Sequence, residues 1–485
     1  MGSAEHALDM PAGAAAPIPD EIPEDQLIAR QSRAHPRGLY LLFATEMWER
    51  FSYYGNRALL ALFMVQALAF DKQFAAALYG KYTGLVYLAP LIGGYVADRW
   101  WGNRRSIFVG GALMAAGQFT LFAAGSMLQT PSSAIMLFYC GLGLIVAGNG
   151  FFKPNISSMV GQLYTQNDSR KDSAYTIFYM GINLGSFIAP LICGFLGDTG
   201  NAADFRWGFF AAGVGMLLSL VVFGFFHKRY LVSPTGAPVG LAPKAAAASA
   251  ASKGNAPLTR EDIDRMIVIG VISFFVIFFW SAFEQAGVSL TFFAEEATNR
   301  QLFGFTVPAS WFQSLNPVFV LIFAPILAQL WSALGRRNKE PSSPTKMAWG
   351  LILLAVGYLI IGFGVKDMSS TAKASMIWLT AMYLMHTLGE LCLSPIGLSL
   401  VNKLAPARFG SLMMAVWFTA NAAANWFAGI LATFYPEAGR TPVFLGYQIT
   451  GLHEFFMLFV AMAFVAGAIL LTLTRPLQKM MHGVR

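Results

Sequence analysis

A short stretch near the start of the chain, residues 46–57 (EMWERFSYYGNR), places two acids and two cations in a segment long enough to span a membrane. A charge in the interior of a bilayer is costly, so these side chains must face partner charges or a water-filled cavity. On a helix the ionisable and tyrosine side chains share one face, and they are Glu46, Glu49, Arg50, Tyr53, Tyr54 and Arg57. The stretch therefore predicts a polar cavity inside a membrane protein, where a transported solute would bind.

The composition is that of a polytopic membrane protein. Of the 485 residues, 56% are hydrophobic and only 12% are charged, against about 25% charged in ordinary soluble domains. The three cysteines, Cys140, Cys193 and Cys392, lie in apolar segments, which argues against a disulfide framework, redox chemistry and a metal site. The net charge of +8 would suit a nucleic-acid partner, but its distribution along the chain gives a different explanation.

Apolar stretches of at least about 20 residues recur along the chain and predict twelve transmembrane helices. They lie at 38–68, 75–98, 104–127, 133–163, 173–197, 206–229, 263–295, 308–334, 345–366, 374–402, 409–434 and 449–474. Residues 230–262, rich in small residues and proline, divide these stretches six and six and are predicted to be a flexible linker. Two halves that face each other across a midplane site are a recurrent transporter plan.

The predicted fold is therefore an all-α integral membrane protein with two six-helix bundles, 38–229 and 263–475. Residues 1–37 are predicted to be a disordered cytoplasmic tail, 230–262 a cytoplasmic linker and 476–485 a second cytoplasmic tail. With both termini inside, the inner loops carry about three times as many Lys and Arg as the outer ones, where we place Lys72 and Lys81. This asymmetry predicts cytoplasmic termini in a cell membrane, and it explains the positive charge without nucleic acid.

The ionisable residues deep within the predicted spans are few, and their net charge is positive in the first half and negative in the second. The first half holds Glu46, Glu49, Arg50, Arg57 and Lys153, and the second holds Glu284 and Glu390. Glu46 and Arg50 are spaced to neutralise each other within one helix. An unpaired buried charge costs on the order of several kcal/mol, so Arg57 and Lys153 should face Glu284 and Glu390. The charges do not decide which cation meets which acid, and the alternative is that they only hold helices together.

The polar and aromatic residues near these charges suit a small zwitterionic solute. The candidates for its binding surface are Tyr53, Tyr54, Tyr87, Tyr179, Asn183, Asn316, Trp280, Trp311, Trp417 and Phe418. Ordinary packing or anchoring at the membrane surface is the alternative for each aromatic residue. His386 lies one turn before Glu390, so it either relays protons or packs between helices.

Three motifs resemble those of the proton-dependent oligopeptide transporters, a family of the major facilitator superfamily. Residues 46–55 (EMWERFSYYG) resemble ExxERFxYYG, residues 178–186 (FYMGINLGS) resemble FYxxINxGS, and residues 151–155 (FFKPN) resemble the lysine segment of the fourth helix. The loop 98–105 (DRWWGNRR) is similar to the superfamily's GxxxDRxGRR loop. Supporting blocks lie at 279–285, 312–317 and 389–395, so that the resemblance covers about residues 38–475.

The resemblance implies a major facilitator fold and a proton-coupled symporter that imports di- and tripeptides by alternating access. It implies proton coupling by Glu46, Glu49, Arg50, Glu284 and Glu390. It implies that Arg57 and Lys153 bind the peptide carboxylate, and that Asn183, Asn316 and Glu390 bind its amino group. The side-chain pockets would be formed by Tyr53, Tyr54, Tyr87, Trp280, Trp417 and Phe418. It pairs Arg57 with Glu284 and Lys153 with Glu390 as gating salt bridges.

The chain departs from the family pattern in two places. Residues 230–262 are too short and too polar to hold the two extra helices that many bacterial relatives have. Animal members carry a histidine on the second helix where this chain has Gly80, so coupling must rest on the carboxylates. Protons are then the coupling ion, with no other cofactor, and the expected partners are a peptide and the lipid bilayer, with the monomer as the functional unit.

Three rival functions remain. Another small solute, such as an amino acid, nitrate or a peptide-like drug, could use the same scaffold, although an amine-binding Glu390 has no purpose for nitrate. An integral membrane enzyme would need a nucleophile–base pair or a metal cluster in the cavity, and the sequence offers neither. A receptor that does not transport is disfavoured because the coupling residues are intact.

Overall fold

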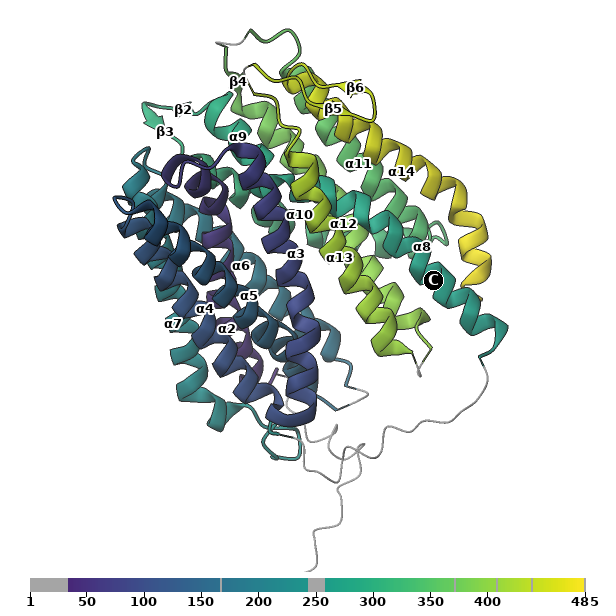
Figure 1. Cartoon of the computed structure of the whole chain (residues 1–485). Helices are drawn as coiled ribbons and strands as arrows, with labels where there is room; N and C mark the ends of the chain where they lie inside the picture. The colour runs from purple at the N-terminus through teal and green to yellow at the C-terminus, as the bar shows by residue number, and fades with distance from the viewer. Residues whose placement is uncertain are drawn as a thin grey trace, which may run out of the picture.

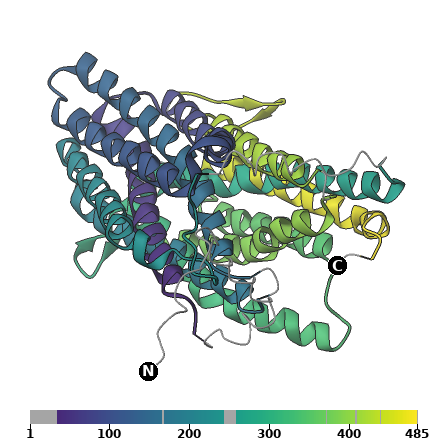
Figure 2. The ribbon, with the colours of Figure 1, turned by 90° about the horizontal axis from the view of Figure 1, so that it is seen from below.

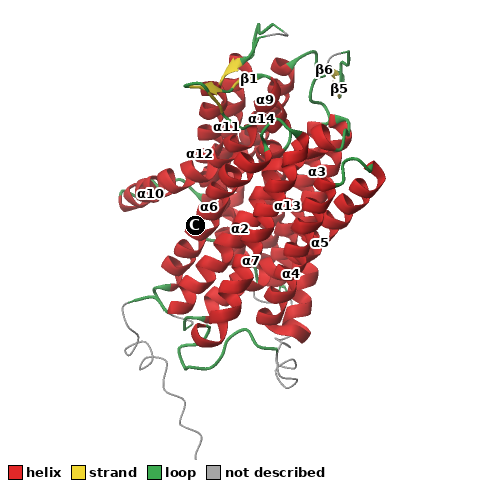
Figure 3. Cartoon of the chain, turned by 90° about the vertical axis from the view of Figure 1, so that its left-hand side faces the viewer, coloured by secondary structure: helices red, strands yellow, loops and turns green. Residues whose placement is uncertain are grey.

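Long helices form almost all of the protein. The computed structural model describes residues 34–165, 168–242, 258–369, 372–406, 409–437 and 439–483. Within these residues twelve helices have 22 residues or more, and three two-stranded sheets lie in the loops at one end (Figures 1 and 3).

The first six long helices pack side by side, purple to teal in Figure 1. The first ends in the π-helical turn Phe63–Ala67, the second in the π-helical turn Ala97–Trp101, and the short 3-10 helix Ala202–Asp204 precedes the last. The six are α2 (Arg37–Leu62), α3 (Lys72–Val96), α4 (Gly102–Ser126), α5 (Pro131–Gln162), α6 (Lys171–Gly197) and α7 (Phe205–Tyr230).

The second group lies beside the first, and the view from below shows the same separation (Figure 2). Its first span is broken by the 3-10 turn Glu284–Gly287, and the 3-10 helix Ala309–Ser314 leads into its second. Its helices are α8 (Arg260–Phe283), α9 (Ser289–Glu296), α10 (Leu315–Arg336), α11 (Ser343–Gly364), α12 (Met376–Leu404), α13 (Gly410–Ala432) and α14 (Leu452–Met480). We call α2–α7 the first half and α8–α14 the second half.

The strands are short and lie in loops. β1 (Thr298–Asn299) pairs in parallel with β4 (Ala374–Ser375). The other two pairs are antiparallel hairpins, β2 (Gln301–Leu302) with β3 (Phe305–Thr306) and β5 (Val443–Phe444) with β6 (Tyr447–Gln448).

The helices agree with the twelve predicted spans to within a few residues at most ends. By length and apolar composition, nine segments of the described chain could cross a membrane, and one of them, Lys72–Ser126, contains both α3 and α4. Helices α2 and α13 are not among the nine. In α2 the charged and polar stripe lowers the hydropathy, although its 26 residues are long enough to span a bilayer.

The predicted linker is partly folded. Arg104 at the start of α4 donates hydrogen bonds to the backbone oxygens of Val239 (2.6 Å) and Leu231 (2.5 Å), and Leu231 is fully buried. Residues 231–242 therefore belong to the folded first half rather than to a flexible linker. Residues 243–257 of the predicted linker lie outside the described part of the chain, and the flanking stretches 231–242 and 258–259 contain no helix.

The ends of the folded chain also differ from the predicted boundaries. Residues 1–33 of the predicted tail lie outside the described residues, and α2 begins at Arg37. Helix α14 continues through Pro476 to Met480, past the predicted end at 475. The last turn stays helical because Leu477 and Met481 are buried against the second half.

The two halves are in close contact where α3 crosses α13. A Cβ atom on Gly80 would lie 2.6 Å from the Cα of Gly429, and a Cβ on Gly429 would lie 2.6 Å from the Cα of Gly80. Real Cβ atoms do not approach so closely, so the helices can meet here only because both residues are glycine.

Polar contacts between the halves gather at the end of the molecule where α3 begins. Lys72 pairs with Glu296 (Nζ–Oε1 2.6 Å), and Gln73 donates to Glu437 (Nε2–Oε2 2.9 Å). Asp198, directly after α6, accepts hydrogen bonds from the backbone nitrogen and the hydroxyl of Ser310, both at 3.0 Å. We call this region, defined by these contacts, the latched end.

Candidate functional site

A cavity of about 280 Å³, lined by both polar and apolar side chains, lies between the two halves. The first half contributes side chains from α2, α3, α5 and α6, and the second half contributes side chains from α8, α10, α12, α13 and the turn after α8. The structure brings almost all of the predicted substrate-binding residues into its lining, namely Tyr54, Arg57, Tyr87, Lys153, Asn183, Trp280, Asn316, Glu390, Trp417 and Phe418.

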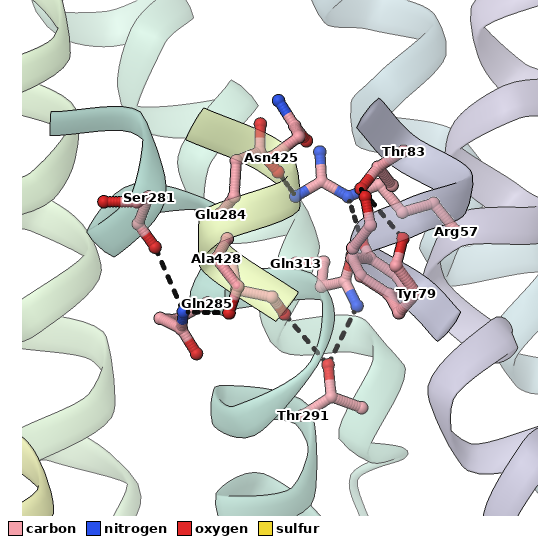
Figure 4. Close-up of polar contacts among 12 residues, drawn as sticks. Arg57, Tyr79, Thr83, Ser281, Glu284, Gln285, Thr291, Gln313, Asn425 and Ala428 are labelled. Carbon is pink, nitrogen blue, oxygen red and sulfur yellow. Dashed lines mark hydrogen bonds and ion pairs between the residues drawn. The ribbon is translucent and has the colours of Figure 1, made fainter. Parts of the chain in front are cut away.

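Arg57 and Glu284 form an ion pair across the halves on one wall of the cavity. Arg57 Nη2 lies 2.5 Å from Glu284 Oε2, with both side chains at least nine-tenths buried. Arg57 Nε also donates a hydrogen bond to the hydroxyl of Tyr79 on α3 (2.8 Å). Figure 4 shows these three side chains converging from α2, α3 and the turn after α8. One of the two predicted pairings is therefore present in this structure.

The helix break that presents Glu284 is held in place by its neighbour Gln285. The fully buried Gln285 amide donates to the backbone oxygens of Ser281 (3.0 Å) and of Ala428 on α13 (2.9 Å), and its oxygen accepts from Ser289 (2.5 Å). Figure 4 shows the first two of these contacts. The Gln285 side chain thus replaces backbone hydrogen bonds that are lost at the helix break. It also connects the break to Ala428 on α13, which directly precedes Gly429.

Lys153 and Glu390 do not form the second predicted pair. Glu390 accepts a hydrogen bond from Asn316 Nδ2 (2.7 Å), and Lys153 Nζ lies 4.6 Å from the centroid of the Tyr87 ring. Neither has an ion-pair partner among the residues that the structure describes. The cavity therefore presents a cation from the first half and an acid from the second, each without a counter-charge.

The predicted pairing within α2 is confirmed, and it includes a third residue. Arg50 Nε lies 3.0 Å from Glu46 Oε1 and 2.5 Å from Glu49 Oε2, and Arg50 Nη2 donates to Glu49 Oε1 (2.9 Å). Asn149 on α5 approaches the same Glu49 oxygen at 3.5 Å. All three charged residues are buried, outside the cavity lining. With two carboxylates on one guanidinium, a single proton balances the charge of the cluster.

Two aromatic candidates lie outside the cavity lining. Tyr53 packs edge-on against Tyr54, with ring centroids 5.3 Å apart, and the Arg50 guanidinium lies over its ring. Trp311 instead donates its indole hydrogen to the Leu191 backbone oxygen (3.1 Å), which joins α6 to the 3-10 helix Ala309–Ser314 near the latched end. Both therefore support neighbouring groups rather than the cavity wall.

His386 shows features of both predicted roles. It lines the cavity, and its ring centroid lies 4.6 Å from that of Tyr358 in the buried core. Its Nε2 atom has no hydrogen-bond partner within the described chain. Its part in a proton relay stays a prediction.

Several residues of the site were not identified from the sequence. Tyr79 contacts Arg57 but lies outside the cavity lining, and its spacing of four and eight residues from Thr83 and Tyr87 puts all three on one face of α3. The lining residues that were not predicted are Ile182, Ser186, Phe283, Ala286, Gln313, Pro317, Tyr383, Ser394 and Asn421.

Comparison with known proteins identifies the family. The sequence model of the POT family matches residues 104–240 and 244–449, which together make up most of the chain. The chain belongs to the POT family.

Relatives of this POT family protein are similar over almost their whole length. The uncharacterized transporter YclF of Bacillus subtilis is 38% identical, covering 93% of this chain and 96% of its own. The peptide transporter YePEPT of Yersinia enterocolitica is 34% identical with the same coverage. A crystal structure of the peptide transporter POT in complex with sulfate is 34% identical, with a TM-score of 0.80 over 95% of this chain and 100% of that one.

These similarities confirm the resemblance read from the three motifs and the predicted fold class, an all-α membrane protein of the major facilitator type. Members of the POT family are transporters, so this POT family protein is a multi-pass membrane transporter and not an enzyme. Its cavity between two halves is the place where a transported solute would bind.

Proposed function

We propose that this POT family protein is a proton-coupled symporter that imports di- and tripeptides through a cell membrane by alternating access. The observation that carries the proposal is the pair of opposite charges, Lys153 and Glu390, which line one cavity from opposite halves without ion partners among the described residues. The relatives named as peptide transporters support the same substrate class.

A short peptide carries a carboxylate at one end and an ammonium group at the other. Lys153, with help from Arg57, binds the carboxylate, while Glu390, Asn316 and Asn183 bind the ammonium group. Because both ends belong to the backbone, this recognition does not depend on sequence. The variable side chains lie against the aromatic surfaces of Tyr54, Tyr87, Trp280, Trp417 and Phe418.

Protons enter this scheme through buried carboxylates. Protonation of Glu49 or Glu46 changes how tightly the pair holds Arg50, and protonation of Glu284 weakens its ion pair with Arg57. That ion pair joins the two halves, so its loss frees them to move apart. Protons are the coupling ion, and the mechanism uses no other cofactor. Since one chain supplies the whole cavity, the monomer is the functional unit.

Membrane orientation follows from the distribution of cations. The asymmetry of Lys and Arg supports a cytoplasmic position for both termini. The latched end, where α3 begins at Lys72, then faces outward. In this orientation the contacts of Lys72 and Asp198 close the cavity toward the outside.

Reconstitution into liposomes tests the proposed function directly. With an acidic exterior and a neutral lumen, we expect radiolabelled dialanine to accumulate above its external concentration, and unlabelled di- and tripeptides to compete. Free amino acids and nitrate should not compete at the same concentrations. Accumulation of nitrate or a single amino acid, rather than of the peptides, would contradict the peptide assignment. Accumulation of peptide without a pH gradient would contradict proton coupling.

Glu390→Gln should weaken binding of peptides with a free amino terminus about tenfold or more, because the amide keeps the shape of the side chain but removes the charge. N-acetylated peptides carry no ammonium group, so their inhibition constants in competition uptake should change little. Glu261→Gln, on the surface of α8, serves as a matched control and should leave both constants unchanged. An equal loss for free and acetylated peptides would show that Glu390 does not contact the amine.

A further inference from the structure

Lys81 is a cation in an unusual position on α3. It lies nine residues after Lys72 at the start of the helix, about 14 Å along the axis at about 1.5 Å per residue. Its side chain is exposed, and in the described chain it has no ion pair or hydrogen bond. By contrast, Arg50 and Arg57 pair with carboxylates. A long, exposed lysine side chain in the outer part of a membrane span can place its charge at the level of the lipid headgroups, where an anionic group can pair with it.

An apolar groove of about 560 Å³ lies beside Lys81, between α3 and α5. It extends from Leu78 to Gly93 on α3 and from Tyr139 to Phe151 on α5, which is about 20 Å at about 1.5 Å per residue. Lys81 is the one charged residue in its lining. The groove is therefore longer than one hydrocarbon leaflet of about 15 Å.

The two helices that line the groove touch near its Gly93 end, since a Cβ on Gly150 would lie 2.8 Å from the Ala89 backbone oxygen. At Gly143, about two turns earlier on α5, an added Cβ would meet no atom within 4 Å, so the groove has free space there. Helical side chains lean toward the N-terminus of their helix, so Lys81 leans away from the helix contact and toward the latched end.

We propose that this groove binds one acyl chain of an anionic phospholipid and that Lys81 binds the phosphate of its headgroup. The apolar lining fits a hydrocarbon chain but offers nothing to a free inorganic anion. Charge complementarity selects the headgroup, because a cation at a membrane surface attracts anionic lipid. The lipid belongs to the leaflet at the latched end.

The position of the groove connects this lipid to the transport cavity. Tyr87 on α3 and Lys153 on α5 line the cavity and contact each other, with the Lys153 ammonium 4.6 Å from the ring centroid. An acyl chain between α3 and α5 therefore lies against the two helices that position Lys153, the unpaired cation of the cavity.

Native mass spectrometry of the full-length protein in detergent tests the proposal, with palmitoyl-oleoyl phosphatidylglycerol (POPG) and its phosphatidylcholine counterpart (POPC) as probes. We expect one POPG retained per chain, in preference to POPC. Lys81→Gln should weaken POPG binding about fivefold. Gly143→Leu places a side chain in the open groove without a clash, so it should fold and lose POPG binding although Lys81 is intact.

Two matched variants separate this site from general lipid attraction. Lys366→Gln removes another exposed lysine, and Gly270→Leu fills a smaller apolar groove beside α8 whose lining has no charged residue. Both should bind POPG as the parent does. Equal retention of POPG and POPC would overturn the selection of an anionic headgroup, and undiminished POPG binding by Lys81→Gln would overturn the phosphate contact. Undiminished binding by Gly143→Leu would overturn the seating of the chain in the groove.

Discussion

Replacing Lys153 with alanine is expected to reduce proton-driven dipeptide uptake to the level of empty liposomes. Lys153 is the cavity cation that lacks an ion partner in the described structure, so it is free to receive a peptide carboxylate. Removing one partner of a buried charge pair costs about 2–5 kcal/mol, which corresponds to a loss of at least thirtyfold in affinity. Initial rates of dialanine uptake at an imposed pH gradient measure the effect.

The matched control is Lys366→Ala, which removes an exposed lysine from the loop after α11 and should transport normally. Lys153→Arg keeps the charge but changes its shape, so partial uptake is expected. The variants must elute as monodisperse proteins of the same size, since a misfolded Lys153→Ala would also be inactive. Near-normal uptake by well-folded Lys153→Ala protein would show that Lys153 does not bind the peptide carboxylate.

Glu49→Gln is expected to abolish accumulation of peptide against its gradient while leaving exchange of peptide for peptide. In the parent protein, Glu46 and Glu49 share the single guanidinium of Arg50, which leaves one excess negative charge in the cluster. Uptake of a proton by one carboxylate neutralises that charge. After the substitution, Glu46 and Arg50 form a neutral pair that needs no proton. The ratio of internal to external peptide under a pH gradient should fall to about one, as expected for uncoupled transport.

Counterflow measures the activity that should remain. Liposomes preloaded with unlabelled dialanine should still take up labelled dialanine through Glu49→Gln, because the cluster lies outside the cavity lining. The matched control is Asp172→Asn, which removes a carboxylate from the exposed first turn of α6. This variant should accumulate peptide as the parent protein does. Full accumulation by Glu49→Gln would show that this carboxylate does not couple protons to transport.

Much of the site could be predicted because charge in a membrane has few allowed arrangements. The helical stripe from Glu46 to Arg57 predicted both the local pairing with Arg50 and a cation facing the second half. Burial without a counter-charge is too costly for Arg57, so an acid such as Glu284 had to lie opposite. The choice of Glu284 over Glu390 came from the family resemblance and not from the charges.

Other features depend on how helices pack and cannot be read from a single sequence. The hydrogen bond from Arg57 to Tyr79 depends on the rotation of α3 against α2. A Lys153–Glu390 pair depends on the separation of the halves, which the proposed alternating-access cycle would change. Residues 231–242 have a linker composition, yet the hydrogen bonds from Arg104 fold them onto the first half.

The meeting of Gly80 and Gly429 has a consequence for how the protein moves. Side chains that interlock between two helices must be pulled apart before the helices can tilt, which opposes rotation. At Gly80 and Gly429 no side chains lie between the two backbones, so this crossing does not resist rotation in that way. It can therefore serve as a pivot about which the two halves tilt. The energy barrier to this tilting then comes mainly from ion pairs between the halves, such as Lys72–Glu296 and Arg57–Glu284. Protons and ligands can weaken these ion pairs.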